Sequence, residues 1–141
     1  MIRVVLDTNV IISALLKEGG APALILSLVF DGHIQLCMTE EIFAEYTGVL
    51  SRGKFQSLDQ ASVKKALLAI KRKSFWVSPK TRINVIKIDP EDNKFLECAL
   101  LAKAHYLITG NRKHFTMAHY DKTRIMSPGD FLYWVVKEIF D

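Results

Sequence analysis

The chain has 141 residues, 50% of them hydrophobic and 24% charged, and this composition excludes a disordered tail and indicates one folded domain over residues 1–141. No apolar run reaches the roughly 18 residues that a membrane span needs, and residues 1–7 lack the pattern of a secretory signal, so no membrane partner is expected. The net charge of +4 is uneven: residues 51–88 carry +9, residues 1–50 carry −4 and residues 89–141 carry −1.

The predicted elements alternate between buried strands and helices. In chain order we expect a strand at residues 2–6, helices at 10–17 and 21–30, a strand at 34–38, helices at 39–50, 60–73 and 89–104, strands at 106–109 and 124–126, and a final helix at 127–140. The segments 75–77 and 85–88 are short and ambiguous. This alternation predicts an α/β domain with a mostly parallel central sheet and helices on both faces. In such sheets, ligands bind beyond the carboxyl ends of the strands.

Four polar side chains are candidates for a site at that edge of the sheet. Asp7 follows the first strand, and Asn111 follows a later one. Asp92 lies in the first turn of its helix, on the inward face, and Glu45 borders the apolar arc of the helix at 39–50. Each also has a purely structural explanation, as a helix cap, a first-turn acid, a core-boundary residue or a turn residue.

Carboxylates gathered at the edge of a core repel one another and lose hydration, which is costly unless a cation binds them. Oxygen ligands select hard cations, so Mg²⁺ or Mn²⁺ is expected there. Two such ions, about 3.5–4 Å apart, can activate a water and stabilise the leaving oxygen of a phosphodiester. The basic segment at 51–88 could hold the polyanion, although its lysines could equally form a solvated helix face.

Four separated motifs occur along the chain: VLDTNVI at residues 5–11, Glu45 on a helix, DPEDNKFLECA at 89–99 and LITGN at 107–111. In order and spacing they resemble the PIN-domain nuclease family, over nearly the whole chain. Within that family the chain resembles the VapC-like toxins of bacterial toxin–antitoxin pairs.

The resemblance carries the family's acidic positions over to Asp7, Glu45 and Asp92. Its fourth position, usually an aspartate, is Asn111 here, with Thr109 as the accompanying hydroxyl. An asparagine offers a neutral oxygen and no charge, so this departure is expected to weaken a second metal site more than the first.

Other positions near the motifs are expected to assist. Thr8 and Asn9 match the family's orienting residues around the first aspartate. Arg112 and Lys113 follow at the mouth of the site, where they are expected to contact phosphate.

The resemblance implies a three-layer α/β/α fold, RNA cleavage that depends on Mg²⁺ or Mn²⁺, a small antitoxin as inhibitor and, often, a homodimer. We expect in-line attack of metal-activated water on a phosphodiester, with Asp7 and Asp92 holding the principal ion. Glu45 is expected to help hold an ion or to position the water, and Asn111 to supply an oxygen at a second site. The two cysteines are far apart in apolar segments, which suits a reducing, cytoplasmic location.

Two other protein classes that carry an aspartate after the first strand fit the sequence less well. A phosphoaspartyl phosphatase needs a second aspartate at the position of Asn9, and a response-regulator receiver needs adjacent acids after the first strand. The stronger alternative is a catalytically weakened PIN module that binds RNA or a protein partner without cutting.

Asp89 is expected to be a cap and Glu97 to be structural, since Glu97 lies about 140° around the helix from Asp92. The strongly apolar helices at 21–30 and 131–140 are expected to pack in the core or to offer a dimer face.

Overall fold

The computed structural model describes residues 1–86, 89–110 and 117–140. Within these residues, six strands form one sheet in the order β3-β2-β1-β4-β6-β5, and neighbouring strands are parallel except for the antiparallel pair of β5 and β6. The strands are β1 (Arg3–Leu6), β2 (Gln35–Met38), β3 (Phe75–Trp76), β4 (Tyr106–Ile108), β5 (His119–Tyr120) and β6 (Thr123–Met126). From β1 the sheet therefore extends to β2 and β3 on one side, and to β4, β6 and β5 on the other.

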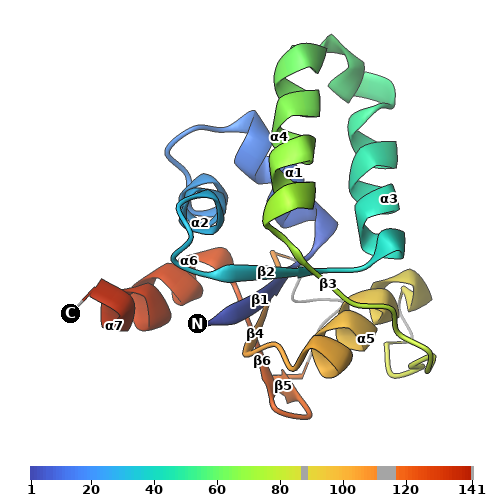
Figure 1. Cartoon of the computed structure of the whole chain (residues 1–141), viewed down its shortest axis with the longest axis vertical. Helices are drawn as coiled ribbons and strands as arrows, with labels where there is room; N and C mark the ends of the chain where they lie inside the picture. Colours follow the sequence, from blue (N-terminus) through green and yellow to red (C-terminus); the bar gives the residue numbers. More distant parts are fainter. Residues whose placement is uncertain (87–88, 111–116, 141) are drawn as a thin grey trace.

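Helices cover both faces of this sheet, as the sequence pattern predicts (Figure 1). On one face lie α1 (Thr8–Leu16), α2 (Ala21–Phe30), α3 (Glu40–Leu50) and α4 (Gln60–Lys73), and on the other lies α5 (Asn93–Ala102). Short helical turns are η1 (Gly53–Ser57) and η2 (Pro90–Asp92). The C-terminal run of α6 (Pro128–Asp130), η3 (Phe131–Val136) and α7 (Lys137–Phe140) begins in contact with α2. The result is a three-layer α/β/α fold.

The core forms where apolar residues recur at the period of each element. In β1, Val4, Val5 and Leu6 are all buried, as expected for a central parallel strand covered on both faces. Helix α4 buries one stripe at Val63, Leu67 and Ile70. Its basic side chains lie on the exposed faces, at Lys64, Lys65, Lys71, Arg72 and Lys73.

Most predicted elements agree with the structure to within one or two residues, and the helix predicted at 21–30 matches its bounds. The helix predicted from Asp89 to about residue 104 begins as the turn η2 and continues as α5. It ends at Ala102, because Lys103 adopts a left-handed conformation with a φ of 54°. Strand β5 was missed, because two residues are too few to show an alternating pattern.

Of the two segments that are ambiguous in the sequence, one forms a strand and the described part of the other does not. Residues 75–76 form the edge strand β3, which pairs with β2. At 85–86 no strand is found, because the side chain of Asn93 takes the two backbone N–H groups of Val85 and Ile86. Residues 87–88 lie outside the described part of the chain.

Among the helices of the described residues, none by itself has both the length and the apolar character to cross a membrane. Helices α1 and α2 would meet those criteria only as a pair, with a bend of 96° between them.

Candidate active site

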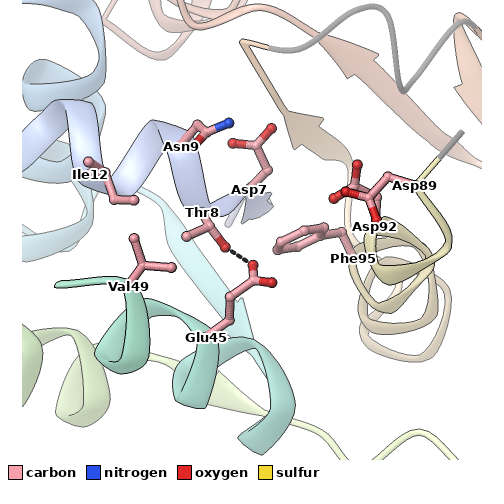
Figure 2. A pocket seen from close by; sticks show the side chains of 9 residues that line it. All are labelled: Asp7, Thr8, Asn9, Ile12, Glu45, Val49, Asp89, Asp92 and Phe95. Atoms are coloured by element: carbon pink, nitrogen blue, oxygen red, sulfur yellow. Dashed lines mark hydrogen bonds between the residues drawn. The ribbon is translucent and has the colours of Figure 1, made fainter. Parts of the chain in front are cut away.

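A pocket of about 200 Å³ opens beyond the carboxyl end of β1 (Figure 2). Its walls come from the start of α1, the middle of α3 and the turn before α5, three segments far apart in the sequence. The lining residues are Asp7, Thr8, Asn9, Ile12, Glu45, Val49, Asp89, Asp92 and Phe95. The pocket lies where the strand order reverses between β1 and β4, the usual place for a ligand in an open α/β sheet.

Asp7 is fixed in the pocket by hydrogen bonds from two elements. It is the N-cap of α1, where its Oδ1 accepts a hydrogen bond from the backbone N–H of Val10 at 3.0 Å. Its Oδ2 accepts a hydrogen bond from the Thr109 hydroxyl at the end of β4. The backbone just before it is held by the buried Tyr46, whose hydroxyl donates to the carbonyl of Leu6. Capping and pocket lining are therefore two roles of the same carboxylate.

The surroundings of Asp7 make its negative charge costly. Burial, above all, raises the pKa of this carboxyl above its ordinary value, and the charge of Asp92 acts in the same direction. The hydrogen bonds from Thr109 and from Val10 lower the pKa in part. A cation between Asp7 and Asp92 would relieve both the desolvation and the repulsion.

Asp92 lines the pocket from a turn that hydrogen bonds of the Asn93 side chain stabilise. The Asn93 side chain is buried, and its Oδ1 accepts hydrogen bonds from Val85 N–H at 3.1 Å and from Ile86 N–H at 2.8 Å. Its Nδ2 donates to the carbonyls of Ile86 at 3.0 Å and of Pro90 at 2.9 Å. One side chain thus ties the segment before η2 to the start of α5.

Glu45 reaches the pocket from α3, as its place beside the apolar arc of that helix predicts. Its side chain is 30% exposed. One carboxylate oxygen, Oε2, accepts a hydrogen bond from the Thr8 hydroxyl, drawn as a dashed line in Figure 2. The other, Oε1, lies 2.8 Å from the ammonium of Lys94.

The donor set suits a hard cation such as Mg²⁺ or Mn²⁺. Asp7 and Asp92 face each other across the pocket (Figure 2), and Mg²⁺ in proteins is often bound through only one or two carboxylates together with water and phosphate. In the part of the chain that the structure describes, no group of three His, Cys, Asp or Glu side chains is placed to hold a metal ion. Asp7 and Asp92, which line this pocket together with Asp89 and Glu45, are a pair that could hold such an ion with the help of water and phosphate.

The structure brings most of the sequence-predicted residues together. Asp7, Glu45 and Asp92 line one pocket, Thr8 and Asn9 line it too, and Thr109 bonds to Asp7. The remaining predicted residues, Asn111, Arg112 and Lys113, lie outside the described residues.

Asp89 and Glu97 are both expected from the sequence to be structural, and the structure places only Asp89 in the acidic pocket. Asp89 caps the following turn, with its Oδ1 accepting from Glu91 N–H at 3.2 Å, but it also lines the acidic pocket, which was not predicted. Glu97 is buried outside this pocket. It accepts hydrogen bonds from Ile83 N–H at 2.9 Å and from the Arg82 guanidinium at 3.3 Å, which agrees with a structural role.

Sequence reasoning also missed the contributions of Asn93 and Lys94. Both lie inside the third motif and both are buried, although polar residues at helix starts are usually exposed. The available signal was their position on a helix whose residues 93–99 are otherwise mostly apolar. A polar side chain that is buried in such a stretch must find partners: Lys94 pairs with Glu45 of the pocket, and Asn93 bonds to the backbone of Ile86, outside it.

Comparisons with known proteins agree with this arrangement. The uncharacterized protein MJ1680 of Methanocaldococcus jannaschii is 35% identical over 113 residues, which cover 79% of this chain and 72% of that protein. VapBC2 from Rickettsia felis, solved bound to a DNA fragment from their promoter, has a similar fold: the TM-score is 0.62 at 15% identity, over 89% of this chain and 98% of the matched one. The PIN domain family matches residues 3–113, a range that takes in all three acidic positions of the pocket. This chain therefore belongs to the PIN domain family, the nuclease family that its motifs resemble.

Proposed function

We propose that this chain is a ribonuclease that hydrolyses RNA phosphodiesters with the help of Mg²⁺ or Mn²⁺. The observation that carries the proposal is the convergence of Asp7, Glu45 and Asp92 on one pocket at the carboxyl end of β1. Family membership supports nuclease chemistry in general. The finer assignment to a divalent ion rests on the oxygen donors of the pocket, and the assignment to RNA rests on the resemblance to VapC-like toxins, with the basic charge supporting a polyanion in general.

Each residue of the pocket has a role in this proposal. Asp7 and Asp92 hold the ion, and Asp7 is kept in place by Thr109. Glu45, held by Thr8, orients the attacking water. Asn111 adds a neutral oxygen ligand. When bound, a divalent ion makes the water more acidic and neutralises charge that develops on the phosphate oxygens.

The exposed basic side chains of α4 support a polyanionic substrate. Five Lys and Arg side chains of this helix are exposed, at Lys64, Lys65, Lys71, Arg72 and Lys73. Helix α4 packs beside α3, which carries Glu45 (Figure 1). Phosphates held along this basic surface would release counterions, so binding is expected to weaken as salt rises. We assign Arg112 and Lys113 to phosphate contacts nearer the site.

We also propose that the chain acts as the toxin of a toxin–antitoxin pair and forms a homodimer. Similarity to VapBC2 in fold and to VapC-like toxins in motifs supports the first part. For the second, Tyr133 and Trp134 stack edge to face on η3 while remaining 63% and 64% exposed. Such aromatic side chains are typical of interfaces. Light scattering on the purified chain should give a dimer mass, and a monomer at high concentration would contradict the dimer.

The nuclease proposal is tested by cleavage of a labelled single-stranded RNA with Mn²⁺, with Mg²⁺ and with EDTA. The wild type should cut only when the ion is present. Asp7→Asn and Asp92→Asn should each lose the activity, whereas Glu91→Gln, which removes an exposed acid beside the pocket, should keep it. Equal trace activity in all variants would mean contamination and would contradict the proposal.

A second candidate function is favoured by two observations. Glu45 is paired with Lys94, and the fourth acidic position of the family is an asparagine, so the pocket offers fewer charged ligands than the family pattern implies. A chain of this kind could bind RNA or a protein partner without cutting. Salt-sensitive RNA binding with no metal-dependent turnover would favour this alternative.

A further inference from the structure

A buried lysine lies beside the acidic pocket, and neither the motif resemblance nor the proposed nuclease mechanism assigns it a role. The side chain of Lys94 is only 4% exposed. A charged ammonium is almost never buried to this extent without partners. Its contacts therefore indicate what its charge does.

The partners of Lys94 divide into one acid of the pocket and one exposed acid. Its Nζ lies 2.8 Å from Glu45 Oε1 and 3.6 Å from Oε2 of Glu91, whose side chain is 77% exposed. The ammonium also donates to the backbone carbonyl of Glu91 at 2.9 Å. Since an ion pair to an exposed carboxylate is weak, Glu45 is the main charged partner.

This pairing leaves Glu45 in a different state from Asp7, the buried acid of the same pocket. Both carboxylate oxygens of Glu45 are engaged, one by the ammonium of Lys94 and one by the hydroxyl of Thr8. Among the described residues, in contrast, the hydrogen bonds to Asp7 come from neutral donors, which include the Val10 N–H and the Thr109 hydroxyl. A cation that approached Glu45 would meet a positive charge already in contact with it.

We propose that Lys94 is a positioning residue that acts as a built-in counter-cation for Glu45. It occupies the place beside Glu45 that a second metal ion would otherwise take. The pocket then binds one divalent ion, between Asp7 and Asp92, and Glu45 stays outside its ligand set. This inference rests on the proposed function for the identity of the ion, and it adds a residue and a stoichiometry to it.

A purely structural ion pair would behave differently from a counter-cation. If Lys94 only stabilises the fold, Lys94→Met lowers stability and leaves metal binding as it was. If Lys94 holds Glu45 away from the ion, the same change frees a carboxylate and removes a repelling charge. Mn²⁺ should then bind about ten-fold more tightly, or a second ion should bind, because a unit charge a few ångströms from a divalent ion has an effect of this size even in a water-like dielectric.

The experiment counts Mn²⁺ bound per chain, and measures its Kd, by electron paramagnetic resonance and calorimetry without RNA. The variants are Lys94→Met, Glu45→Gln, the two combined, and Asp92→Asn, with Glu91→Gln as the matched control for the exposed partner. We expect one ion in the wild type and in Glu91→Gln. Lys94→Met should gain affinity or a second ion, and adding Glu45→Gln should reverse the gain. Asp92→Asn should lower the affinity about ten-fold or more, and Glu45→Gln alone by less.

Two results would overturn the inference. One is a loss of Mn²⁺ in Glu45→Gln as large as in Asp92→Asn. The other is an unchanged count and Kd in folded Lys94→Met. Should Lys94→Met fail to fold, the comparison of Glu45→Gln with Asp92→Asn decides alone, because Glu45 is partly exposed. A wild type that binds no Mn²⁺ would overturn the proposed function together with this inference, whereas one ion bound without RNA cleavage would overturn only the proposed function.

Discussion

Replacing Asn93 by alanine should cost more stability than any surface change near the pocket. The side chain makes four hydrogen bonds, two of them with Ile86, which is itself buried. Asn93→Ala leaves the N–H and the carbonyl of Ile86 without these partners. A buried polar group left unsatisfied costs about 1–3 kcal/mol, so two of them, partly relieved by water, cost about 3 kcal/mol.

The matched control for this change lies in the same segment. Asn84 is exposed, so Asn84→Ala should lower the free energy of unfolding by no more than about 0.5 kcal/mol. For a chain of this size, 3 kcal/mol corresponds to a fall in Tm of about 10 °C. Thermal and urea unfolding, followed by circular dichroism, measure both quantities.

The comparison of the two asparagine variants can refute the reasoning. Equal Tm values for Asn93→Ala and Asn84→Ala would mean that the Asn93 bonds do not fasten the turn. A large loss in Asn93→Ala should also lower metal binding, because Asp92 precedes the altered residue and relies on the same turn.

Three further predictions follow from buried groups. Because burial raises the pKa of Asp7, the folded chain binds a proton there more tightly than the unfolded chain, so stability falls as pH rises above the ordinary value of 3.8. Without divalent ions, Asp7→Asn should therefore have a higher Tm than the wild type at pH 7, and this difference in Tm should vanish near pH 4. A difference in Tm that grows on acidification would contradict the reasoning. Burial raises the pKa of the Cys37 thiol to about 11 and also raises the pKa of the Cys98 thiol. Neither cysteine should therefore react with a thiol reagent at pH 8 until denaturant is added. Fast reaction of the native chain would show that the thiols are accessible and would contradict this prediction. Tyr46→Phe, which leaves the carbonyl of Leu6 without its donor, should cost about 1 kcal/mol in urea unfolding, and an unchanged midpoint would count against the bond.

The strands and helices could be predicted where burial and period agree. The continuous apolar run of β1 predicts a buried strand, and the spacing of Val63, Leu67 and Ile70 predicts a helix with one buried face. Glu45 could be placed at the pocket because it borders the apolar arc of α3. These are properties of one element at a time, and a single sequence carries them.

Contacts between elements could not be predicted in the same way. The pair of Lys94 and Glu45 joins residues 49 positions apart, and nothing local in either helix requires it. The bonds of Asn93 explain why the segment at 85–86, ambiguous in the sequence, forms no strand: the Asn93 side chain takes the backbone N–H groups that a neighbouring strand would have used. The role of Asp89 in the pocket depends likewise on how η2 faces α1.

The most direct test of the central claim compares RNA cleavage with RNA binding in the wild type and Asp92→Asn. Both proteins are incubated with the same labelled single-stranded RNA and Mn²⁺, and bound and cut RNA are measured together. If this pocket is the active site, Asp92→Asn keeps the RNA bound, because the basic side chains of α4 are unchanged, and loses the metal-dependent cutting. Equal cutting by the two proteins, or binding by both without any metal-dependent cutting, would contradict the claim that this pocket is the active site of a nuclease.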